Sequence, residues 1–334
     1  MIRVNNFVLV ITDICNLRCR HCYLSCGSAR EGGGFYEKRG IMSVAQAQRY
    51  IEQLSAFKGI VKKVHIAGGE ISLFKDNLKE IVFLLKKHKL PVSIVTNCSW
   101  AKDQKRAEDF VRCMSEQGVG QMQLSVSRFH QEFLDIGHAI RAVQACKKFG
   151  VEAVLRPLVT DEDNADDVIK NIPDNTLKGI IINPNKCNSI GRAGEEISKK
   201  EFSKAKLPYY GCFPTINLTI RSDGSVYPCC CGSETTKALC LGNLEKESLR
   251  DIITRAELDP LLGILFFQGP KYLSEILYQQ GGKDFRDGDY SCICDMCNAL
   301  FSDEDIVRDL RRATEAYIHD KHCELLRSGQ PCFV

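Results

Sequence analysis

The chain has 334 residues, and its 45 Lys and Arg side chains are nearly balanced by 42 Asp and Glu, for a net charge of +3. This length suits one large domain, or a medium domain with a smaller one. The near-neutral charge argues against non-specific binding to a nucleic-acid backbone. No apolar run approaches the roughly 20 residues that span a bilayer, and the first apolar run is too short for a signal peptide, so we expect a cytoplasmic protein.

Cysteine is the unusual component, with 18 residues in the chain. In a reducing cytosol, clustered thiols indicate metal sites more often than disulfides. One group of closely spaced cysteines lies near the N-terminus and another lies in the last third of the chain. The two groups predict two separate metal centres.

From residue 7 to about residue 190, strand-like and helix-like segments alternate, and six segments are rich in β-forming residues: Phe7–Thr12, Lys63–Ala67, Pro91–Thr96, Gln121–Ser127, Val151–Val159 and Gly179–Asn183. Six β-then-α units predict parallel strands joined by right-handed crossovers. The number of units fits either a doubly wound sheet or a partial barrel. Both folds place function at the C-terminal ends of the strands.

The predicted helices carry recognisable starts and stops. Ser43 and Gln46 form a capping box ahead of the first helix. Further helices are expected over Asp76–Lys89, Asp103–Gln117 and Gln131–Phe149, and Gly118 and Gly150 end the last two of these.

After Gly194 the pattern changes. A Lys-rich linker leads into a predicted β-hairpin, two helices, a loop rich in Gly and Asp, and a last helix that Ser302 caps and that runs to about Leu326. The linker, the two strands, the two helices and the loop span Ser198–Lys206, Ile216–Ile220, Ser225–Tyr227, Ser248–Ala256, Leu261–Phe267 and Gly281–Asp289. We therefore divide the chain into residues 1–197, 198–301 and 302–334.

Cys15, Cys19 and Cys22 follow the first predicted strand directly, with C-x3-C-x2-C spacing. Three thiolates can hold three irons of a cubane 4Fe–4S cluster and leave the fourth iron open for chemistry. The second strand ends in Gly68-Gly69-Glu70, where the glycines allow a close backbone approach. The alternative is a zinc site with Cys26 as the fourth ligand, but zinc sites usually use paired C-x2-C or C/H knuckles, and no second pair follows here.

Together with His21 before the third cysteine, these motifs resemble those of the radical S-adenosylmethionine (radical SAM) superfamily. The resemblance implies a partial (β/α)6 TIM-like barrel. It also implies that the fourth iron binds the amino and carboxylate groups of S-adenosylmethionine, and that one electron cleaves this molecule to give a 5′-deoxyadenosyl radical. In the family the Gly-Gly-Glu backbone contacts the methionyl amino group, and Glu70 would support that contact.

By the same resemblance, residues at the ends of later strands contact the ribose hydroxyls and the methionyl carboxylate. The residues at these positions are Asn97, Ser125, Ser127 and Arg156. Arginine suits a carboxylate because it binds both oxygens. Loop capping would explain each of these residues equally well. The sequence identifies no catalytic acid, base or hydrogen donor.

The second constellation surrounds the predicted hairpin. Cys212 precedes it, Cys229 follows in a Gly-x4-Cys pattern, and Cys294 and Cys297 form a distant C-x2-C pair. This arrangement resembles the auxiliary-cluster domains called SPASM and twitch, although the full SPASM order of cysteines is missing. It implies a small α+β domain with one auxiliary 4Fe–4S cluster. Four further cysteines could replace one of these ligands or bind a second cluster: Cys230, Cys231, Cys240 and Cys292. A structural zinc ribbon is the alternative.

The resemblance implies an enzyme that removes a hydrogen atom from an unreactive carbon. Members with these auxiliary domains mostly modify ribosomally made peptides or protein side chains, so a peptide is the expected substrate and a small natural-product precursor is the alternative. One expected partner is a flavodoxin- or ferredoxin-type electron donor. Peptide-modifying members often carry a peptide-binding module before the barrel, but here the first strand begins at about residue 7, so we expect a separate peptide-recognition protein. Consumption of S-adenosylmethionine, its recycling and methyl transfer remain open.

A non-enzymatic alternative is a binding module stabilised by zinc or a cluster. Binding to nucleic acid would require a basic face with interleaved aromatic residues. The Lys-rich linker is the one candidate, and a solvated loop explains it better.

Overall fold

The structure is a computed structural model that describes residues 5–28, 40–202, 207, 210–212, 217–230 and 232–328. Its centre is one sheet with the strand order β10-β9-β8-β1-β2-β3-β4-β5-β6, and β7 pairs with β5. The neighbouring pairs from β1 to β6 are all parallel. Because β10 and β6 form two separate edges, the barrel is partial, as the sequence predicts. The first seven strands are Asn6–Thr12, Lys63–Gly68, Val92–Thr96, Val119–Val126, Glu152–Val159, Ile181–Ile182 and Asn185–Lys186.

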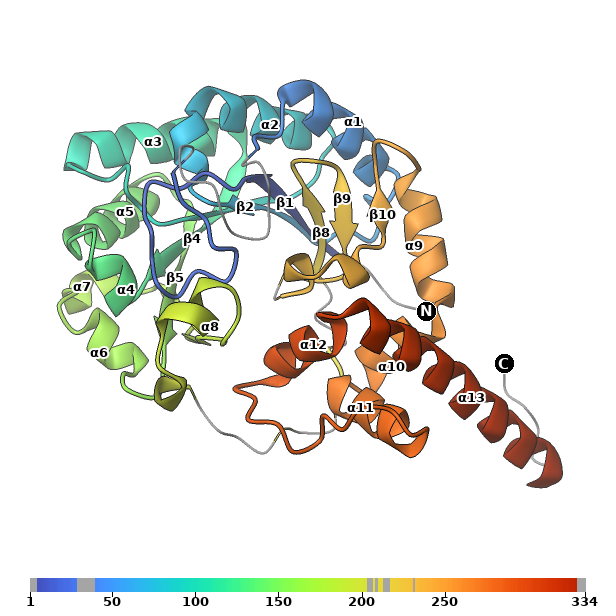
Figure 1. Ribbon diagram of the computed structural model, residues 1–334. Helices are drawn as coiled ribbons and strands as arrows, with labels where there is room; N and C mark the ends of the chain where they lie inside the picture. The colour runs from blue at the N-terminus through green and yellow to red at the C-terminus, as the bar shows by residue number, and fades with distance from the viewer. Residues whose placement is uncertain are drawn as a thin grey trace.

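The helices that connect these strands cover the outer face of the sheet (Figure 1). The capping box of Ser43 and Gln46 is present, Asp103 caps α3, and Gly118 ends α3 with a φ of 110°. These starts and stops confirm the predictions. The connecting elements are α1 Val44–Ser55, η1 Ile71–Phe74, α2 Lys75–Lys87, α3 Gln104–Gln117, α5 Gly137–Lys148, α6 Ala165–Ile169 and α7 Asp174–Leu177.

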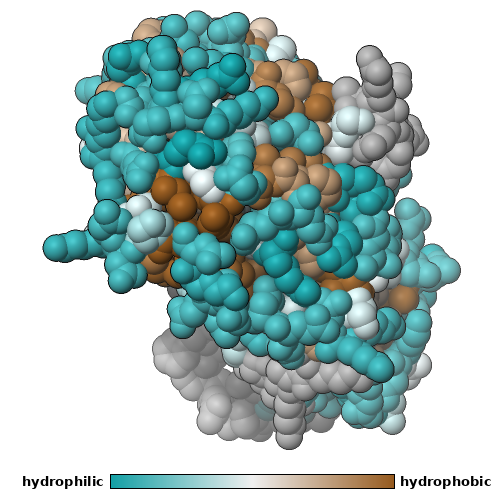
Figure 2. Space-filling view, turned by 90° about the vertical axis from the view of Figure 1, so that its left-hand side faces the viewer, coloured by the Kyte–Doolittle hydropathy of each residue, from teal (hydrophilic) through white to brown (hydrophobic). Residues whose placement is uncertain are grey.

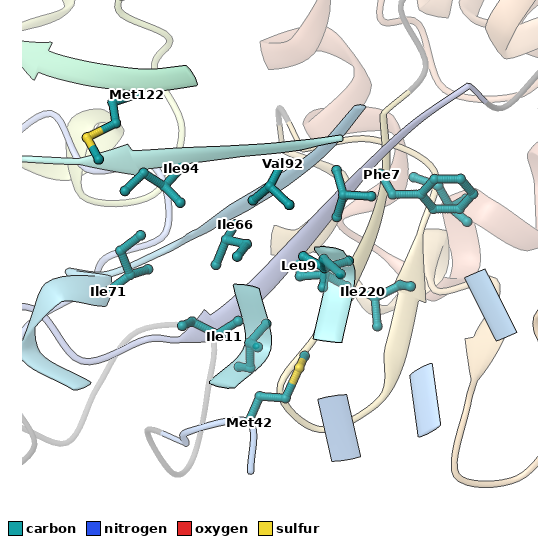
Figure 3. Close-up of a cluster of buried hydrophobic side chains, with 14 of the residues drawn as sticks. Phe7, Leu9, Ile11, Met42, Ile66, Ile71, Val92, Ile94, Met122 and Ile220 are labelled. Atoms are coloured by element: carbon teal, nitrogen blue, oxygen red, sulfur yellow. The ribbon is translucent and has the colours of Figure 1, made fainter. Parts of the chain in front are cut away.

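The core lies between the strands and these helices. Phe7, Leu9 and Ile11 alternate along β1, are fully buried, and lie in one layer with Ile66 of β2 and Ile94 of β3 (Figure 3). Successive strand residues point to opposite faces of a sheet. The other face, inside the barrel, therefore receives the intervening residues, many of which are polar on β2 to β5.

The segment after β4 differs from the prediction of one helix over Gln131–Phe149. Ser127 ends the strand and caps the short helix α4, Arg128–Gln131, by accepting a hydrogen bond from the His130 backbone N–H. The chain then turns, and Asp135 Oδ1 accepts from Gly137 N at 2.8 Å where α5 begins. Helix α4 therefore ends where the predicted helix begins, and α5 begins at Gly137 rather than at Gln131.

The predicted hairpin is present, with β8 Asn217–Arg221, β9 Ser225–Tyr227 and a third strand, β10 Gly242–Asn243. Strand β8 also pairs in parallel with β1, from Asn6 opposite Asn217 onward. The hairpin therefore extends the barrel sheet. The division of the chain at residues 197 and 198 stays a prediction. Residue 216 and residues 203–206 of the predicted hairpin and linker lie outside the described residues.

The C-terminal helices α10 to α13 contact one another beyond the hairpin (Figure 1). Helices α9 and α10 were predicted, whereas α11 and α12 were not. The prediction that Ser302 caps the last helix is wrong: Ser302 ends α12, and Asp303 Oδ1 accepts from the backbone N–H groups of Asp305 and Ile306. The remaining elements are α8 Arg192–Glu196, η2 Lys199–Glu201, η3 Ser233–Thr235, η4 Lys237–Leu239, α9 Leu249–Leu258, α10 Pro260–Phe267, α11 Pro270–Gln279, α12 Ile293–Phe301 and α13 Glu304–Ser328.

The surface in Figure 2 is mostly hydrophilic, with hydrophobic side chains gathered in patches near its middle. Within the part of the chain that the structure describes, no helix is both long and apolar enough to cross a membrane.

A buried ion triad joins the barrel to the segment after the hairpin. Arg221, at the end of β8, donates from one guanidinium nitrogen to Asp13 and from another to Glu234, both at 2.6 Å. The three side chains are 1%, 4% and 0% exposed. Removing one member of a buried pair leaves an uncompensated charge in the core. The triad therefore fixes the loop after β1 against η3.

We expect Arg221→Met to lower the free energy of unfolding by about 3–5 kcal/mol, because two carboxylates stay buried without their counter-charge. Urea unfolding under anaerobic, reducing conditions measures this change. The control is Arg255→Met, which removes the exposed ion pair with Glu247 and should change stability by at most about 1 kcal/mol. Equal losses in both variants would contradict a structural role for the triad.

Glu234 should also make stability depend on pH. Burial of the carboxyl raises its pKa from 4.5 to about 7. Between these values the folded protein keeps a proton that the unfolded chain has released, so the free energy of unfolding falls as pH rises through this window. Glu234→Gln removes this contribution, and buried histidines contribute equally to both proteins. The stability of the variant relative to wild type should rise across that window; a constant difference would contradict the assignment.

Candidate active site and cysteine centres

The three N-terminal cysteines lie on one closed loop at the C-terminal end of β1. Its base is closed by a bridge between Ile14 and Gly27, and Cys15 N donates to Gly27 O at 2.8 Å. Inside the loop, Cys22 N donates to Cys19 O at 3.2 Å. The predicted spacing therefore produces one compact loop at the C-terminal ends of the strands, where the fold predicts the functional site.

The thiols on this loop affect one another electrostatically. Burial raises the pKa of Cys15 to about 12, with a contribution from the charge of Cys22, and the pKa of Cys19 is raised for the same reasons. The pKa of Cys22 is lowered to about 6, mainly by a hydrogen bond with the thiol of Cys26. Several thiolates this close and this buried need positive charge to compensate them, which the irons of a cluster would supply.

The donor set fits a cluster that leaves one iron without a protein ligand. Cys15, Cys19 and Cys22 offer three thiols, and a cubane cluster takes one thiolate for each iron. Among the residues that the structure describes, no three His, Cys, Asp or Glu side chains are placed to hold a single metal ion.

Gly68 and Gly69 are required by the packing of β2 against β1. Gly68 has a φ of 144°, and a Cβ there would lie 2.2 Å from the carbonyl oxygen of Thr12. A Cβ on Gly69 would lie 2.1 Å from the carbonyl oxygen of Ile14. In this structure the two glycines thus approach the backbone that leads into the cysteine loop. Their close approach to a ligand stays a prediction.

Glu70 braces the ends of two strands beside this loop. Its fully buried carboxylate accepts from Ser72 N at 3.0 Å, Thr96 Oγ1 at 2.8 Å and Asn97 N at 2.8 Å. Burial raises the pKa of the carboxyl, whereas the three donors lower it. Asn97 then reaches the loop itself, since its Nδ2 lies 3.8 Å from Cys15 Sγ and donates to Asn16 Oδ1 at 3.1 Å.

The other predicted ligand residues lie further along the sheet. Ser127 caps α4, and its Oγ lies 2.8 Å from His130 Nδ1. Ser125 of β4 is opposite Arg156 of β5. The structure thus brings Asn97 to the cysteine loop, whereas it holds Ser127 in a cap, and the cofactor roles of all four strand-end residues stay predictions.

Arg156 belongs to a polar row inside the barrel that the sequence analysis missed. It donates to Gln123 Oε1 at 2.7 Å and to Asn185 Oδ1 at 3.0 Å. Gln123 Nε2 in turn lies 3.0 Å from His65 Nδ1, and burial lowers the pKa of His65 to about 4. The period-2 alternation of polar residues along β2 and β4 was the signal that could have revealed this row.

The second cysteine group gathers beside α12. The pKa of the buried Cys297 is raised by burial and by the nearby charges of Cys229, Cys212 and Cys292. Burial raises the pKa of Cys212 to about 12, again with contributions from Cys229 and Cys292. The predicted ligands Cys212, Cys229 and Cys297 therefore share one neighbourhood, which Cys292 joins.

The remaining thiols of this region have different surroundings. Cys294 hydrogen-bonds to Cys292, and Cys230 Sγ accepts from Asn217 Nδ2 at 3.7 Å. Cys240 is exposed on the surface. Cys231 lies outside the described residues. The choice of Cys212, Cys229, Cys294 and Cys297 as the four ligands stays a prediction.

Two family comparisons agree with this geometry. Residues 9–172 match the radical SAM superfamily, and residues 212–298 match SPASM, described as an iron–sulfur cluster-binding domain. The chain belongs to the radical SAM superfamily and carries a SPASM domain. It is therefore an enzyme whose cofactors are S-adenosylmethionine, a 4Fe–4S cluster that binds it, and an auxiliary iron–sulfur centre. The predictions of family, enzymatic activity and cofactors are confirmed.

One similar protein is YydG of Bacillus subtilis (strain 168), whose name assigns it provisionally to peptide biosynthesis. The two sequences are 22% identical over 316 residues, which cover 92% of this chain and 95% of YydG. Among solved structures, native anSMEcpe with bound AdoMet has a TM-score of 0.54 at 16% identity and covers 96% of this chain and 98% of its own. The same protein with AdoMet and the Kp18Cys peptide has a TM-score of 0.52 at 14% identity, with coverages of 93% and 99%. These likenesses show the fold.

We expect Cys297→Ser to destabilise the auxiliary cluster and to lower the iron content by up to about four irons per chain, because one iron loses its thiolate. Iron is counted after anaerobic reconstitution. Cys113→Ser is the matched control, since Cys113 lies on α3, outside both cysteine groups, and it should keep the wild-type iron content. Full iron content in the Cys297 variant, with an unchanged electron paramagnetic resonance spectrum of the reduced auxiliary cluster, would show that this thiol is no ligand.

Proposed function

We propose that this radical SAM enzyme modifies a ribosomally synthesised peptide or a protein side chain by removing a hydrogen atom from an unreactive carbon. The observation that carries the radical chemistry is the closed loop of Cys15, Cys19 and Cys22 against Gly68-Gly69-Glu70. The choice of a peptide is supported by the name of YydG and by the peptide bound to anSMEcpe.

In this proposal Cys15, Cys19 and Cys22 hold the first cluster. When bound, that cluster supplies the one electron that cleaves S-adenosylmethionine to methionine and a 5′-deoxyadenosyl radical, which takes the hydrogen atom from the substrate. Cys212, Cys229, Cys294 and Cys297 hold the auxiliary cluster.

The residues around the loop orient the methionyl end of S-adenosylmethionine. The N–H groups of Gly69 and Glu70 donate to the carbonyl oxygens of Thr12 and Ile14, both within 2.9 Å. A methionyl ammonium is itself a donor, so its contacts go to carbonyl oxygens of the Gly-Gly-Glu segment. Glu70 acts indirectly, by holding this segment against the end of β3.

Polar groups inside the barrel receive the rest of the cofactor and the substrate. Asn97 is suited to this role because its Nδ2 lies 3.8 Å from Cys15 Sγ. Arg156 presents a guanidinium held by Gln123 and Asn185, which suits a carboxylate. Ser125 and Ser127 would serve the ribose hydroxyls.

The proposed chemistry requires partners. The electron comes from a flavodoxin- or ferredoxin-type carrier of low potential. A separate protein recognises the peptide, and the reaction takes place in the cytoplasm.

We expect Cys19→Ala to abolish cleavage of S-adenosylmethionine, because the first cluster loses a ligand. Cys294→Ala should keep some uncoupled cleavage but form no modified product. Both are measured by chromatography of 5′-deoxyadenosine and methionine after reduction with dithionite. Cleavage retained in the Cys19 variant would refute the assignment of the first cluster.

The substrate class is tested with deuterated candidates. Transfer of deuterium from a peptide into 5′-deoxyadenosine, with a mass change of the peptide, supports peptide modification. Transfer from a small natural-product precursor alone would favour the alternative substrate class. Formation of S-adenosylhomocysteine would instead indicate methyl transfer.

A further inference from the structure

One buried cation outside the predicted site lies against the cysteine loop. Arg192, the first residue of α8, is 5% exposed. Its Nη1 donates to Cys19 O at 3.1 Å and its Nη2 donates to Cys26 O at 2.6 Å. Figure 1 shows α8 beside the loop that follows β1, although Arg192 and Cys19 are 173 positions apart in sequence.

The backbone of the same residue makes two further contacts. Arg192 N donates to Cys22 O at 3.2 Å and lies 3.0 Å from Ser25 Oγ. One residue thus contacts both Cys19 and Cys22 through their carbonyl groups. The loop between them cannot shift without breaking these hydrogen bonds.

The preceding glycine makes this approach possible. Gly191 has a φ of 60°, and a Cβ there would lie 2.1 Å from the carbonyl oxygen of Tyr23. The backbones of α8 and the cysteine loop are therefore in direct contact, and a larger residue at this position would separate them.

The guanidinium of Arg192 brings a buried positive charge to the segment that carries the cysteines, because it is hydrogen-bonded to the carbonyl oxygens of Cys19 and Cys26. An arginine side chain stays protonated throughout the physiological range. The partners of the guanidinium are carbonyl oxygens, so its positive charge is not cancelled by a bonded carboxylate among the described residues.

We infer that Arg192 is a positioning residue for the first cluster, which both holds the Cys19–Cys26 segment and makes one-electron reduction of the cluster more favourable. Each reduction adds one negative charge to a centre that is already anionic through its thiolates. A fixed cation nearby stabilises the reduced state more than the oxidised state, because the attraction grows with charge. The inference rests on the cluster assignment of the proposed function and is independent of its substrate.

The test is an electron paramagnetic resonance titration of the anaerobically reconstituted enzyme with dithionite, which supplies the single electron. We compare wild type with Arg192→Gln, which keeps a hydrogen-bond donor but removes the charge, and with Arg192→Lys, which keeps the charge. At a fixed solution potential, the ratio of reduced to oxidised first cluster should fall about tenfold in the Gln variant, whereas the Lys variant should stay close to wild type.

Arg18→Met is the matched control. Arg18 lies on the same loop and pairs with Glu196 of the same helix, but its side chain is 54% exposed. Its removal should leave the ratio unchanged, because solvent screens an exposed charge.

Far-ultraviolet circular dichroism and iron content of each variant accompany the titration. If Arg192→Gln loses its iron while Arg192→Lys keeps it, the role of the charge in holding the centre is supported. An Arg192→Gln enzyme that binds iron fully and is reduced like wild type overturns the inference, as does an equal shift in the Arg18 control. Neither readout involves the peptide, so failure of the substrate proposal leaves this test intact.

Discussion

The two cysteine centres depend on one buried guanidinium. Arg221 at the end of β8 binds Asp13, which stands two residues before Cys15, and Glu234, which follows the segment of Cys229 and Cys230. The parallel pairing of β8 with β1 brings these groups together. Because all three side chains are buried, neither loop can move away without leaving a charge unpaired in the core. The relative position of the two centres is therefore a property of the sheet.

A second buried arginine, Arg192, has a different kind of partner at the same end of the barrel. Arg221 is matched by carboxylates, whereas Arg192 is bonded to carbonyl oxygens of the cysteine loop and keeps a local positive charge beside it. Glycines make two separate backbone contacts possible. Gly68 and Gly69 allow β2 to pack on β1, and Gly191 allows α8 to pack on the loop. The cysteine loop is thus held from two sides by backbone contacts that side chains would prevent.

Local patterns predicted much of this structure. The capping box at Ser43, the stop at Gly118 and the position of Cys15 after β1 all depend on residues close in sequence, so their chemistry is visible there. The pairing of β8 with β1 and the two buried arginines are long-range features. The sequence alone cannot distinguish a buried arginine from an arginine on the surface. Only the fold shows that Arg221 and Arg192 are buried. Helix α12 was not predicted, although Met296, Leu300 and Phe301 recur at helical spacing and form a buried face.

The most direct test of the central claim is the metal content of the protein after anaerobic reconstitution with iron and sulfide, with iron and zinc measured in the same sample. We expect about eight irons per chain, for two 4Fe–4S clusters, and about twelve would add a second auxiliary cluster. About four irons with one zinc would keep the radical chemistry and reduce the second centre to a structural site. Zinc alone, with no iron taken up, would contradict the claim that the loop of Cys15, Cys19 and Cys22 holds a cluster for radical chemistry.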